Sequence, residues 1–383
     1  MLLFFGSILL TFAVLEYFLF PKLLTHLPLK LHFAVRPELR LLTQVSKDSV
    51  IPESYIAIFG DSYAQGYGDW LLNADVNTNP PFHSANVLHD LLGEDIISFG
   101  NSGSSNMQGL IGNPVSWLNY INTSRFKKLG LPKEIIFYFY EGNDLNDNLL
   151  DLKLRYMDRN FDPARVYEEK YFRNFLEKEV IRHNGKDNTS WFNEFYLVDF
   201  ISKILEGPEE TVHDDVVPFK EGTVNRAIVG GKEINMPDGL HSPSLELSSN
   251  EIHLGIYILK QSLSYMLQHF TGIKVSMVYL PSVMTCYEMS STYISFQPYD
   301  KGRETLAKAS QISLKSDQIY SLVLAVTQEL GVPLFDTRPI LREAASRKII
   351  HGPMDWKHLN KEGYHILANA IVKMRERTAK THS

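Results

Sequence analysis

A serine within a glycine-bracketed turn is the first candidate for chemistry in this chain. Ser62 belongs to the string GDSYAQG, residues 60–66, which directly follows the apolar, β-prone run 55–59. Glycine tolerates the backbone angles of a sharp strand-to-helix turn, and in parallel α/β sheets chemistry collects at the carboxyl ends of strands. The pattern predicts a nucleophile at the tip of a sheet, with an ordinary turn serine as the alternative.

A possible partner for this serine lies near the C-terminal end. A serine hydroxyl is a poor nucleophile until a base, usually a histidine oriented by a carboxylate, takes its proton. Residues 355–360 read DWKHLN, so Asp355 and His358 are three residues apart and can hydrogen-bond within one turn. A helix expected at 361–375 would hold this turn against the sheet. We therefore predict His358 as the base and Asp355 as the acid that orients it.

Acyl chemistry also needs donors for the oxyanion that develops on the carbonyl oxygen. The Ser62 N–H stands at the expected start of a helix, where the helix dipole favours negative charge. Gly103, in the turn 101–105, can offer a second N–H, and Asn143, just after the run 134–140, can offer a side-chain amide. These three groups are the predicted oxyanion hole.

Four blocks, GDSYAQG, GNSGSS, EGND and DWKHLN, follow one another in this order. They resemble the four sequence blocks of the SGNH (GDSL-type) hydrolase superfamily, over residues 53–144 and 270–375. The resemblance implies a three-layer α/β/α sandwich with a parallel sheet, SGNH/flavodoxin-like, and hydrolysis of ester or acyl groups. It gives the nucleophile, base and acid roles to Ser62, His358 and Asp355, and the oxyanion roles to Ser62, Gly103 and Asn143.

One position departs from the family pattern. The third block usually reads Gly-x-Asn-Asp, and here Glu141 stands at its first position. Asn143 keeps its place, so we expect an intact oxyanion hole, with Gly142 relaxing the turn instead.

The order of patterns predicts how the chain is organised. Strands separated by helical stretches indicate βαβ units and a parallel sheet, and the expected core strands are 55–59, 96–99, 134–140, 274–280 and 332–336, the last at an edge because it contains a proline. Two stretches interrupt this alternation of strands and helices. Residues 145–210 are rich in charged and aromatic residues and are expected to be helical, and residues 211–250 are polar and are expected to form a hairpin or loop. The expected segments are an anchor (1–21), a connector (22–52), the first part of the core (53–144), an insertion or cap (145–250), and the second part of the core with the Asp-x-x-His block (251–378).

The N-terminal segment predicts a membrane anchor. Residues 2–20 are apolar except for Glu16, and about 20 apolar residues span a bilayer as a helix. A cleaved signal peptide is the alternative, but no basic region precedes the segment and no small-x-small site follows it. Lys22, Lys30, Arg36 and Arg40 come after the helix, which by the positive-inside rule places the bulk of the chain in the cytoplasm.

A looser resemblance points to the other side of the membrane. The strings VYLPSVMTCYE and VPLFDTRPILREAA resemble polysaccharide O-acetyltransferases of the alginate-modifying kind. The resemblance implies a single-pass protein of the bacterial inner membrane whose catalytic domain is periplasmic, and a membrane protein as acyl donor. We expect this extracytoplasmic orientation, against the charge count.

Other polar residues have simpler interpretations. Asp238 and His241 repeat the Asp-x-x-His spacing in a Gly/Pro-rich loop, where a surface turn is expected. His351 is expected to be a solvated loop histidine, and Asp61 to cap the helix that begins at Ser62. Turn and capping roles are expected for Asp144 and Asp147 rather than metal binding, and core packing for Tyr67 and Trp70 rather than a place in a pocket.

Composition excludes several classes. The net charge of −6 argues against a nucleic-acid binder, and the single cysteine, Cys286, excludes an intrachain disulfide and a cysteine-based zinc site. No cofactor and no metal are predicted. Three functions remain: an esterase acting on an acylated carbohydrate or lipid, an O-acetyltransferase for a cell-surface polysaccharide, and an inactive carbohydrate-binding protein.

Overall fold

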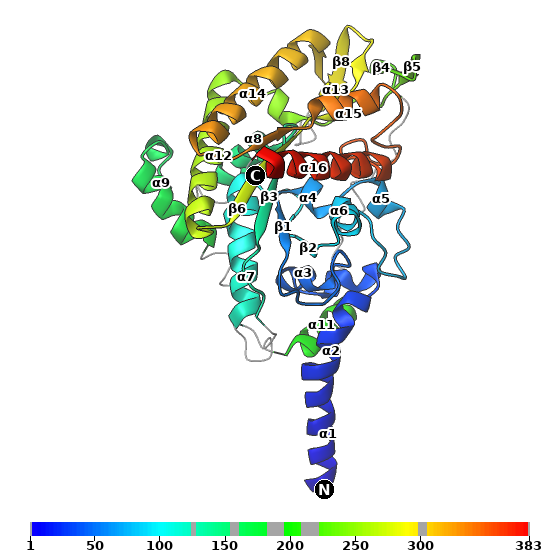
Figure 1. Ribbon diagram of the computed structural model, residues 1–383, viewed down its shortest axis with the longest axis vertical. Helices are drawn as coiled ribbons and strands as arrows, with labels where there is room; N and C mark the ends of the chain where they lie inside the picture. Colours follow the sequence, from blue (N-terminus) through cyan, green and yellow to red (C-terminus); the bar gives the residue numbers. More distant parts are fainter. Residues whose placement is uncertain are drawn as a thin grey trace.

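A parallel five-stranded sheet forms the centre of the protein (Figure 1). The computed structural model describes residues 2–123, 128–153, 161–181, 195–207, 222–297 and 305–381. The strand order is β10-β6-β3-β1-β2, so the predicted parallel sheet is confirmed and the proline-containing strand lies at an edge. The strands are β1 (Ile56–Phe59), β2 (Ile96–Ser98), β3 (Glu134–Tyr140), β6 (Lys274–Leu280) and β10 (Leu334–Asp336).

The apolar strand sequences are explained by burial on both faces of the sheet. All residues of β1 and β3 are buried, and β3 pairs with β6 along its whole length, from Glu134 opposite Lys274 to Tyr140 opposite Leu280. Parallel sheets are covered by helices on both faces, so their strands are apolar throughout rather than alternating.

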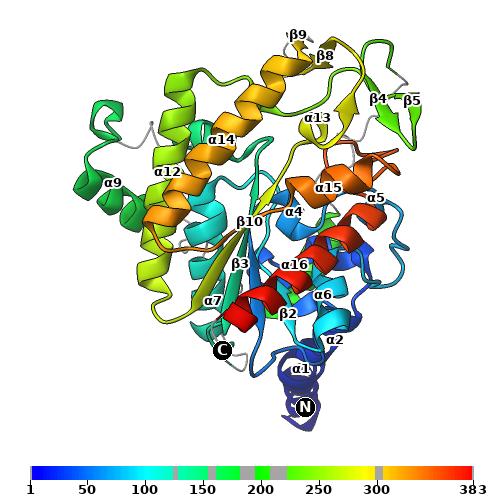
Figure 2. The ribbon, with the colours of Figure 1, turned by 45° about the horizontal axis from the view of Figure 1, so that its top comes forward.

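Helices complete the predicted three layers (Figure 2). The chain moves one way across the sheet from β1 to β2 and the other way from β2 through β3 and β6 to β10. Because βαβ crossovers are right-handed, the helix between β1 and β2 lies on one face and the helices of the later crossovers lie on the other. One face carries α6 (Ser84–Leu92), α15 (Arg338–Ala345) and α16 (Lys361–Thr381), and the other carries α7 (Asn113–Thr123), α12 (Ser249–His269) and α14 (Ala309–Glu329). The Ser248 side chain and Glu251 form a capping box that starts α12.

Short helices and turns stand near the carboxyl ends of the strands. They turn the chain sharply after each strand, which leaves polar side chains at that edge of the sheet. They are α4 (Ser62–Gln65), α5 (Asp69–Leu72), η5 (Gln108–Gly112), α8 (Asp144–Asp151) and α13 (Val283–Cys286).

The region expected as an insertion contains helices and a hairpin. The helical and hairpin predictions agree with the described parts, although residues 154–160, 182–194 and 208–221 lie outside them. The cap as a separate unit stays a prediction. Its elements are η8 (Pro163–Arg165), α9 (Glu169–Phe175), η9 (Leu176–Ile181), α11 (Tyr196–Glu206), β4 (Arg226–Val229), β5 (Lys232–Asn235) and η12 (Pro243–Leu245). The later strands β7 (Glu288–Met289), β8 (Tyr293–Phe296) and β9 (Thr305–Lys308) were not expected; β7 joins β4, and β8 pairs with β9.

The N-terminal helix projects from the body of the molecule (Figure 1). Residues Phe4–His26 are long and apolar enough to cross a membrane, with a mean hydropathy of 1.7 and only 11% of the segment buried. A signal sequence has the same properties, so the helix by itself does not decide between them. The segments are α1 (Leu2–Val14), η1 (Leu15–Leu19), α2 (Phe20–Leu23), η2 (Leu24–His26), η3 (Leu29–Ala34), η4 (Pro37–Leu39) and α3 (Arg40–Thr43).

Candidate active site

The turn after β1 holds Ser62 at the start of α4. Gly60 has φ +143°, and a Cβ there would lie 2.9 Å from the Tyr138 carbonyl oxygen, so both the backbone angle and the close packing require glycine. The Asp61 carboxylate accepts the Tyr63 N–H at 2.9 Å and caps the helix, as expected. Ser62 is only 4% exposed, so its hydroxyl lies inside the fold at the carboxyl edge of the sheet.

The structure brings Ser62, His358 and Asp355 together. His358 Nε2 lies 2.8 Å from Ser62 Oγ, and His358 Nδ1 lies 2.6 Å from Asp355 Oδ2. With the Nδ1 proton donated to Asp355, Nε2 is free to accept the serine proton. The Ser62 hydroxyl also lies 3.2 Å from Asp61 Oδ2, a longer contact that competes with His358 for the same proton.

Asp355 is held as a carboxylate. Burial alone would raise its pKa, but the charge of His358, the hydrogen bond with its ring and the Lys357 N–H together lower the pKa to about 2. The Lys357 N–H donates to Asp355 Oδ1 at 2.8 Å, so both oxygens have partners. An ionised Asp355 fixes the imidazole tautomer and stabilises an imidazolium if one forms.

Groups outside the motifs hold the histidine loop in place. Asp69 Oδ1 accepts the N–H groups of Met354 and Asp355, at 2.7 and 3.2 Å, and the Tyr63 hydroxyl donates to the Lys357 carbonyl at 2.8 Å. The loop also packs so closely on Gly68 that a Cβ there would collide with the Leu359 carbonyl. Sequence reasoning missed Asp69, because no local pattern connects it to a segment almost 300 residues away.

The two further oxyanion candidates differ in their surroundings. Gly103 is exposed with φ +69°, and its turn is fastened beside α4 because the Ser102 N–H donates to Gln65 Oε1 at 2.6 Å. Asn143 is buried, and its Nδ2 donates to Asp147 Oδ2 at 2.9 Å. The amide expected to stabilise an oxyanion is therefore bonded to a carboxylate in the unliganded protein.

Buried carboxylates surround Asn143. Burial raises the pKa of Asp61, against hydrogen bonds from the Tyr63 N–H and Asn143 and the charge of His358. Burial and the charges of Asp61 and Asp147 raise the pKa of Asp144 well above its ordinary value, which favours a protonated Asp144. It accepts hydrogen bonds from Asn106 Nδ2 and the Tyr140 N–H. Among the described residues, no group of three or more side chains is arranged to hold a metal ion.

Glu141, the departure from the family pattern, has a structural role. Its buried carboxylate accepts hydrogen bonds at 2.7 Å from the hydroxyls of Tyr279 and Ser316, and at 3.0 Å from the Ser282 N–H. It therefore ties β3 to β6 and α14. A Cβ on Gly142 would collide with the Tyr140 ring, so position 142 requires glycine for steric reasons.

The remaining polar candidates also have identifiable partners. The Asp238 carboxylate accepts three consecutive N–H groups of residues 223–225, as a turn residue would. The expectation for His351 was wrong: it is 1% exposed, burial lowers its pKa to about 3, and its Nδ1 lies 3.2 Å from the Tyr287 hydroxyl. Trp70 stacks on His365.

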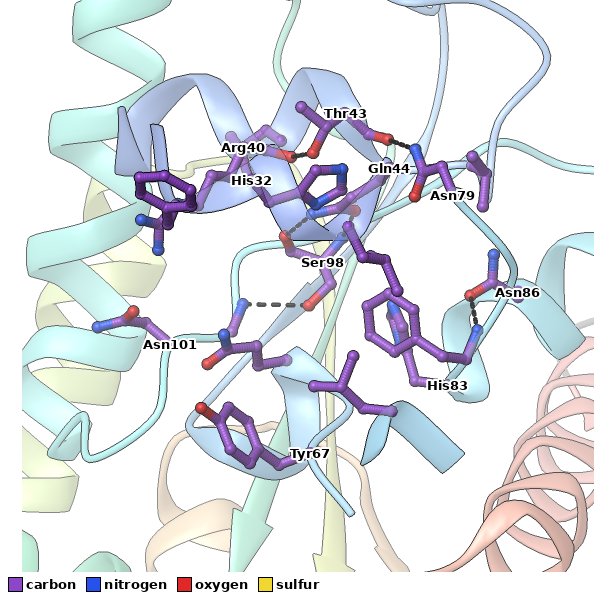
Figure 3. A pocket seen from close by; sticks show the side chains of 18 of the residues that line it. His32, Arg40, Thr43, Gln44, Tyr67, Asn79, His83, Asn86, Ser98 and Asn101 are labelled. Atoms are coloured by element: carbon purple, nitrogen blue, oxygen red, sulfur yellow. Dashed lines mark hydrogen bonds between the residues drawn. The ribbon is translucent and has the colours of Figure 1, made fainter. Parts of the chain in front are cut away.

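A cavity of about 500 Å³ lies beside this site, between the connector and the core (Figure 3). Figure 3 shows His32 and Arg40 on one side of it and Tyr67 and Asn101 on the other. Tyr67 was expected in the core, but it lines this cavity, and its ring centroid is 5.7 Å from that of His358.

Comparisons with known proteins gave structural neighbours only. No family model and no curated protein matches the chain. It is similar to a lipase/acylhydrolase from Enterococcus faecalis, with 13% identity over 84% of this chain and 94% of that one and a TM-score of 0.32. It is also similar to a carbohydrate acetylesterase family member from Sinorhizobium meliloti, with 12% identity over 84% and 98% of the two chains and a TM-score of 0.31.

A third neighbour is an alpha/beta hydrolase from the metagenome of Lake Arreo, Spain, with 13% identity over 84% and 95% of the chains and a TM-score of 0.32.

Proposed function

We propose that the protein is an SGNH-type serine hydrolase that cleaves ester bonds through Ser62, His358 and Asp355. The observation that carries the proposal is the continuous hydrogen-bond chain from Asp355 through the His358 ring to the Ser62 hydroxyl, at 2.6 and 2.8 Å. Two of these residues are 296 positions apart, and a structural serine needs no such arrangement.

The chemistry follows from this geometry. His358 Nε2 takes the Ser62 proton as Oγ attacks the ester carbonyl, and a tetrahedral intermediate forms. When the intermediate collapses, the C–O bond to the alcohol breaks and His358 returns the proton to the leaving oxygen. The acyl group then stays on Ser62 until His358 activates a water, which releases the acid and restores the serine.

The oxyanion would be stabilised by the N–H groups of Ser62 and Gly103 and by the Asn143 amide. These donors stand at the carboxyl edge of β1, β2 and β3. The Asn143 amide carries two N–H donors, and the bond of one of them to Asp147 fixes the orientation of the amide.

The same acyl-enzyme supports transfer if a sugar hydroxyl replaces the water. We propose hydrolysis as the primary function and polysaccharide O-acetylation as the alternative, because only the acceptor differs. The helix at Phe4–His26 would anchor the enzyme in a bacterial inner membrane with its catalytic domain in the periplasm. Alkaline phosphatase fused after Ser383 tests this topology: an active fusion supports export, and an inactive one with an active cytosolic reporter refutes it.

Labelling and kinetics test the nucleophile. A fluorophosphonate should add one mass tag, on the peptide that contains Ser62, and Ser62→Ala should lose both the tag and about 10⁶-fold of p-nitrophenyl ester turnover. Ser321→Ala, which removes an exposed helical hydroxyl, is the matched control. Unchanged turnover in Ser62→Ala would refute the mechanism.

The choice between hydrolysis and transfer needs an acceptor. The purified full-length protein would be incubated with an acetyl donor and an oligosaccharide, and both products measured. Acetylated sugar favours transfer, and free acetate alone favours hydrolysis.

A further inference from the structure

The cavity beside the active site has walls that do not belong to the four sequence blocks alone. The connector supplies one wall, with Phe33 and Leu41, and the segment after the nucleophile supplies another, with Leu72 and Val76. A volume of about 500 Å³ lies within the ordinary range of ligand pockets, about 300 to 1,000 Å³.

Most polar groups of the cavity wall are already satisfied by the protein. The Gln44 amide pairs with the Ser98 backbone in both directions, at 2.7 and 2.8 Å, and Asn79 donates to the carbonyls of Thr25 and Thr43. His83 is buried, accepts the Ala85 N–H, and has a pKa lowered to about 4 by burial, so it is neutral. The cavity is therefore apolar in effect over most of its surface.

Two cations line the cavity: Lys30 is exposed and donates to the neutral Asn77 side chain at 2.9 Å, whereas Arg40 is partly buried. Its Nε donates to the Val35 carbonyl at 3.2 Å, and within the described part of the chain no carboxylate lies at ion-pair distance from it. The neighbouring Arg36, by contrast, pairs with Asp199 at 2.8 Å. Burial lowers the pKa of Arg40 from its ordinary value, yet guanidinium stays charged in proteins. Glu38 acts on Arg40 electrostatically without pairing with it at ion-pair distance, and a partly buried guanidinium has further N–H donors for an anionic ligand.

Tyr67 connects this cation to the reacting groups. It lines the cavity, as Arg40 does, and its ring packs near the His358 ring. Tyr67 therefore belongs both to the cavity wall and to the surroundings of His358.

We propose that the cavity binds an anionic amphiphile, an acyl ester with one hydrocarbon chain and a carboxylate or phosphate. The chain lies against the connector, Arg40 binds the anion, and the ester reaches Ser62 past Tyr67. That the bound molecule is a substrate or acyl donor rests on the proposed function. Binding itself does not.

Binding is measured on the full-length protein carrying Ser62→Ala, so that turnover cannot interfere. The probes are dodecyl phosphate, dodecanoate and uncharged dodecanol, and the readout is the fraction of protein bound in native mass spectra from a neutral detergent. Arg40→Gln should weaken binding of the anions by about 10- to 100-fold and leave dodecanol unchanged. Comparison of dodecyl phosphate with dodecanoate shows whether the cavity prefers a phosphate or a carboxylate.

Two further variants complete the test. Lys22→Gln removes an exposed charge outside the cavity and should change nothing. Val76→Trp, at a position that lines the cavity and is 46% exposed, should weaken all three probes by filling the space. Equal affinity for the three probes, or binding insensitive to Arg40→Gln and Val76→Trp, would overturn the proposal. If Ser62 proved not to be the nucleophile, the outcome of these binding measurements would not be affected.

A separate observation concerns a second surface of the protein. It is the attachment of α11 to the N-terminal helix. The Glu16 carboxylate, 2% exposed, accepts the N–H groups of Tyr196 and Leu197 at 2.7 and 2.9 Å. Aromatic pairs on both sides of this contact join Phe12 to Phe195 and Phe20 to Phe200, at 5.4 and 5.3 Å. The start of α11 therefore lies beside residues 12–20, the half of the apolar segment nearest the connector, and Glu16 is satisfied there as a helix cap.

The outer face of α11 is apolar and exposed. Val198, Ile201 and Leu205 recur at helical spacing, and Leu205 is 81% exposed. The part of the N-terminal helix that α11 contacts also exposes apolar side chains, among them Phe18 and Leu19. We infer that α11 lies in the membrane interface with this face in lipid, since a helix attached at that level cannot avoid the bilayer if the N-terminal helix spans it.

Fluorescence tests this placement. Cys286 is buried, so Ile201→Cys and Glu206→Cys can each be labelled singly with an environment-sensitive dye in the full-length protein in phosphatidylglycerol–phosphatidylethanolamine vesicles. Glu206 is exposed and is turned about 140° around the helix axis from Ile201, so nitroxide lipids should quench the dye at position 201 several-fold more than at position 206. Equal quenching, or none, would contradict the inference.

Discussion

On the base side of Ser62 the His358 ring is held between two partners, at 2.6 and 2.8 Å, whereas on the oxyanion side the Asn143 amide is bonded to Asp147. Asp69 and Tyr63 brace the loop of the base. Gly103, in contrast, stands in an exposed turn. The proposed groups for proton transfer are thus hydrogen-bonded to one another, whereas the proposed oxyanion donors include an amide with one N–H donated to Asp147 and an N–H in an exposed turn.

The difference has a physical basis. A neutral histidine and a carboxylate attract each other through an N–H donor that is present at rest, so their geometry is stable in the free protein. An oxyanion hole is complementary to charge that exists only in the transition state. Until then a buried amide such as Asn143 needs another acceptor, and Asp147 provides it. Substitutions on the two sides should therefore have effects on kcat and KM that differ in size and in kind.

The largest of these effects is expected at Asp355. Asp355→Asn keeps the shape of the side chain but replaces an acceptor of the Nδ1 proton by an amide that can donate, which favours the wrong tautomer of His358. We expect kcat to fall by about 10⁴-fold, measured with a p-nitrophenyl ester at saturating substrate. A fall of less than tenfold would mean that the base side is not built around this carboxylate.

A smaller loss is expected on the oxyanion side. Asn143→Ala removes a donor needed only in the transition state, so kcat should fall by about 100- to 1000-fold with little change in KM. Asp147→Asn is the companion variant: it weakens the resting acceptor and should cost far less. If Asn143→Ala leaves kcat unchanged, the bond to Asp147 is purely structural and Asn143 is not an oxyanion donor.

The same division explains what the sequence could predict. Ser62 and the pair Asp355–His358 stand in short contiguous strings whose spacing is tied to their geometry, and the five core strands are apolar runs because both faces of the sheet are covered. The roles of Asp69 and Glu141 could not be predicted this way, since their partners lie at distant positions. The burial of His351 likewise depends on packing against Tyr287, which no local pattern contains.

The bracing of the base side gives a more modest prediction. Asp69→Ala leaves the N–H groups of Met354 and Asp355 without their acceptor, which loosens the loop of His358. Misplacement of this kind is expected to lower kcat by about 10- to 100-fold. Asp69→Asn keeps an acceptor oxygen and should restore most of the activity. Equal losses in both variants would point to the charge of Asp69 rather than to positioning.

The smallest effect concerns stability and needs no substrate. The folded-state pKa of Asp355, about 2, lies below the ordinary value of 3.8, so the unfolded chain binds this proton first as the pH falls. The carboxylate therefore stabilises the fold above pH 3.8, by about 2 kcal/mol, and this contribution is lost as the pH falls toward 2.

Urea unfolding of the wild type and Asp355→Asn between pH 5 and pH 2.5 measures it. The difference in free energy of unfolding should be largest at pH 5 and shrink steadily below pH 4. Asp90→Asn, which changes an exposed carboxylate of α6, should show a flat difference. A difference for Asp355→Asn that is also flat would mean that the base side is not preassembled in the free protein, and the contrast between the two sides of Ser62 would be lost.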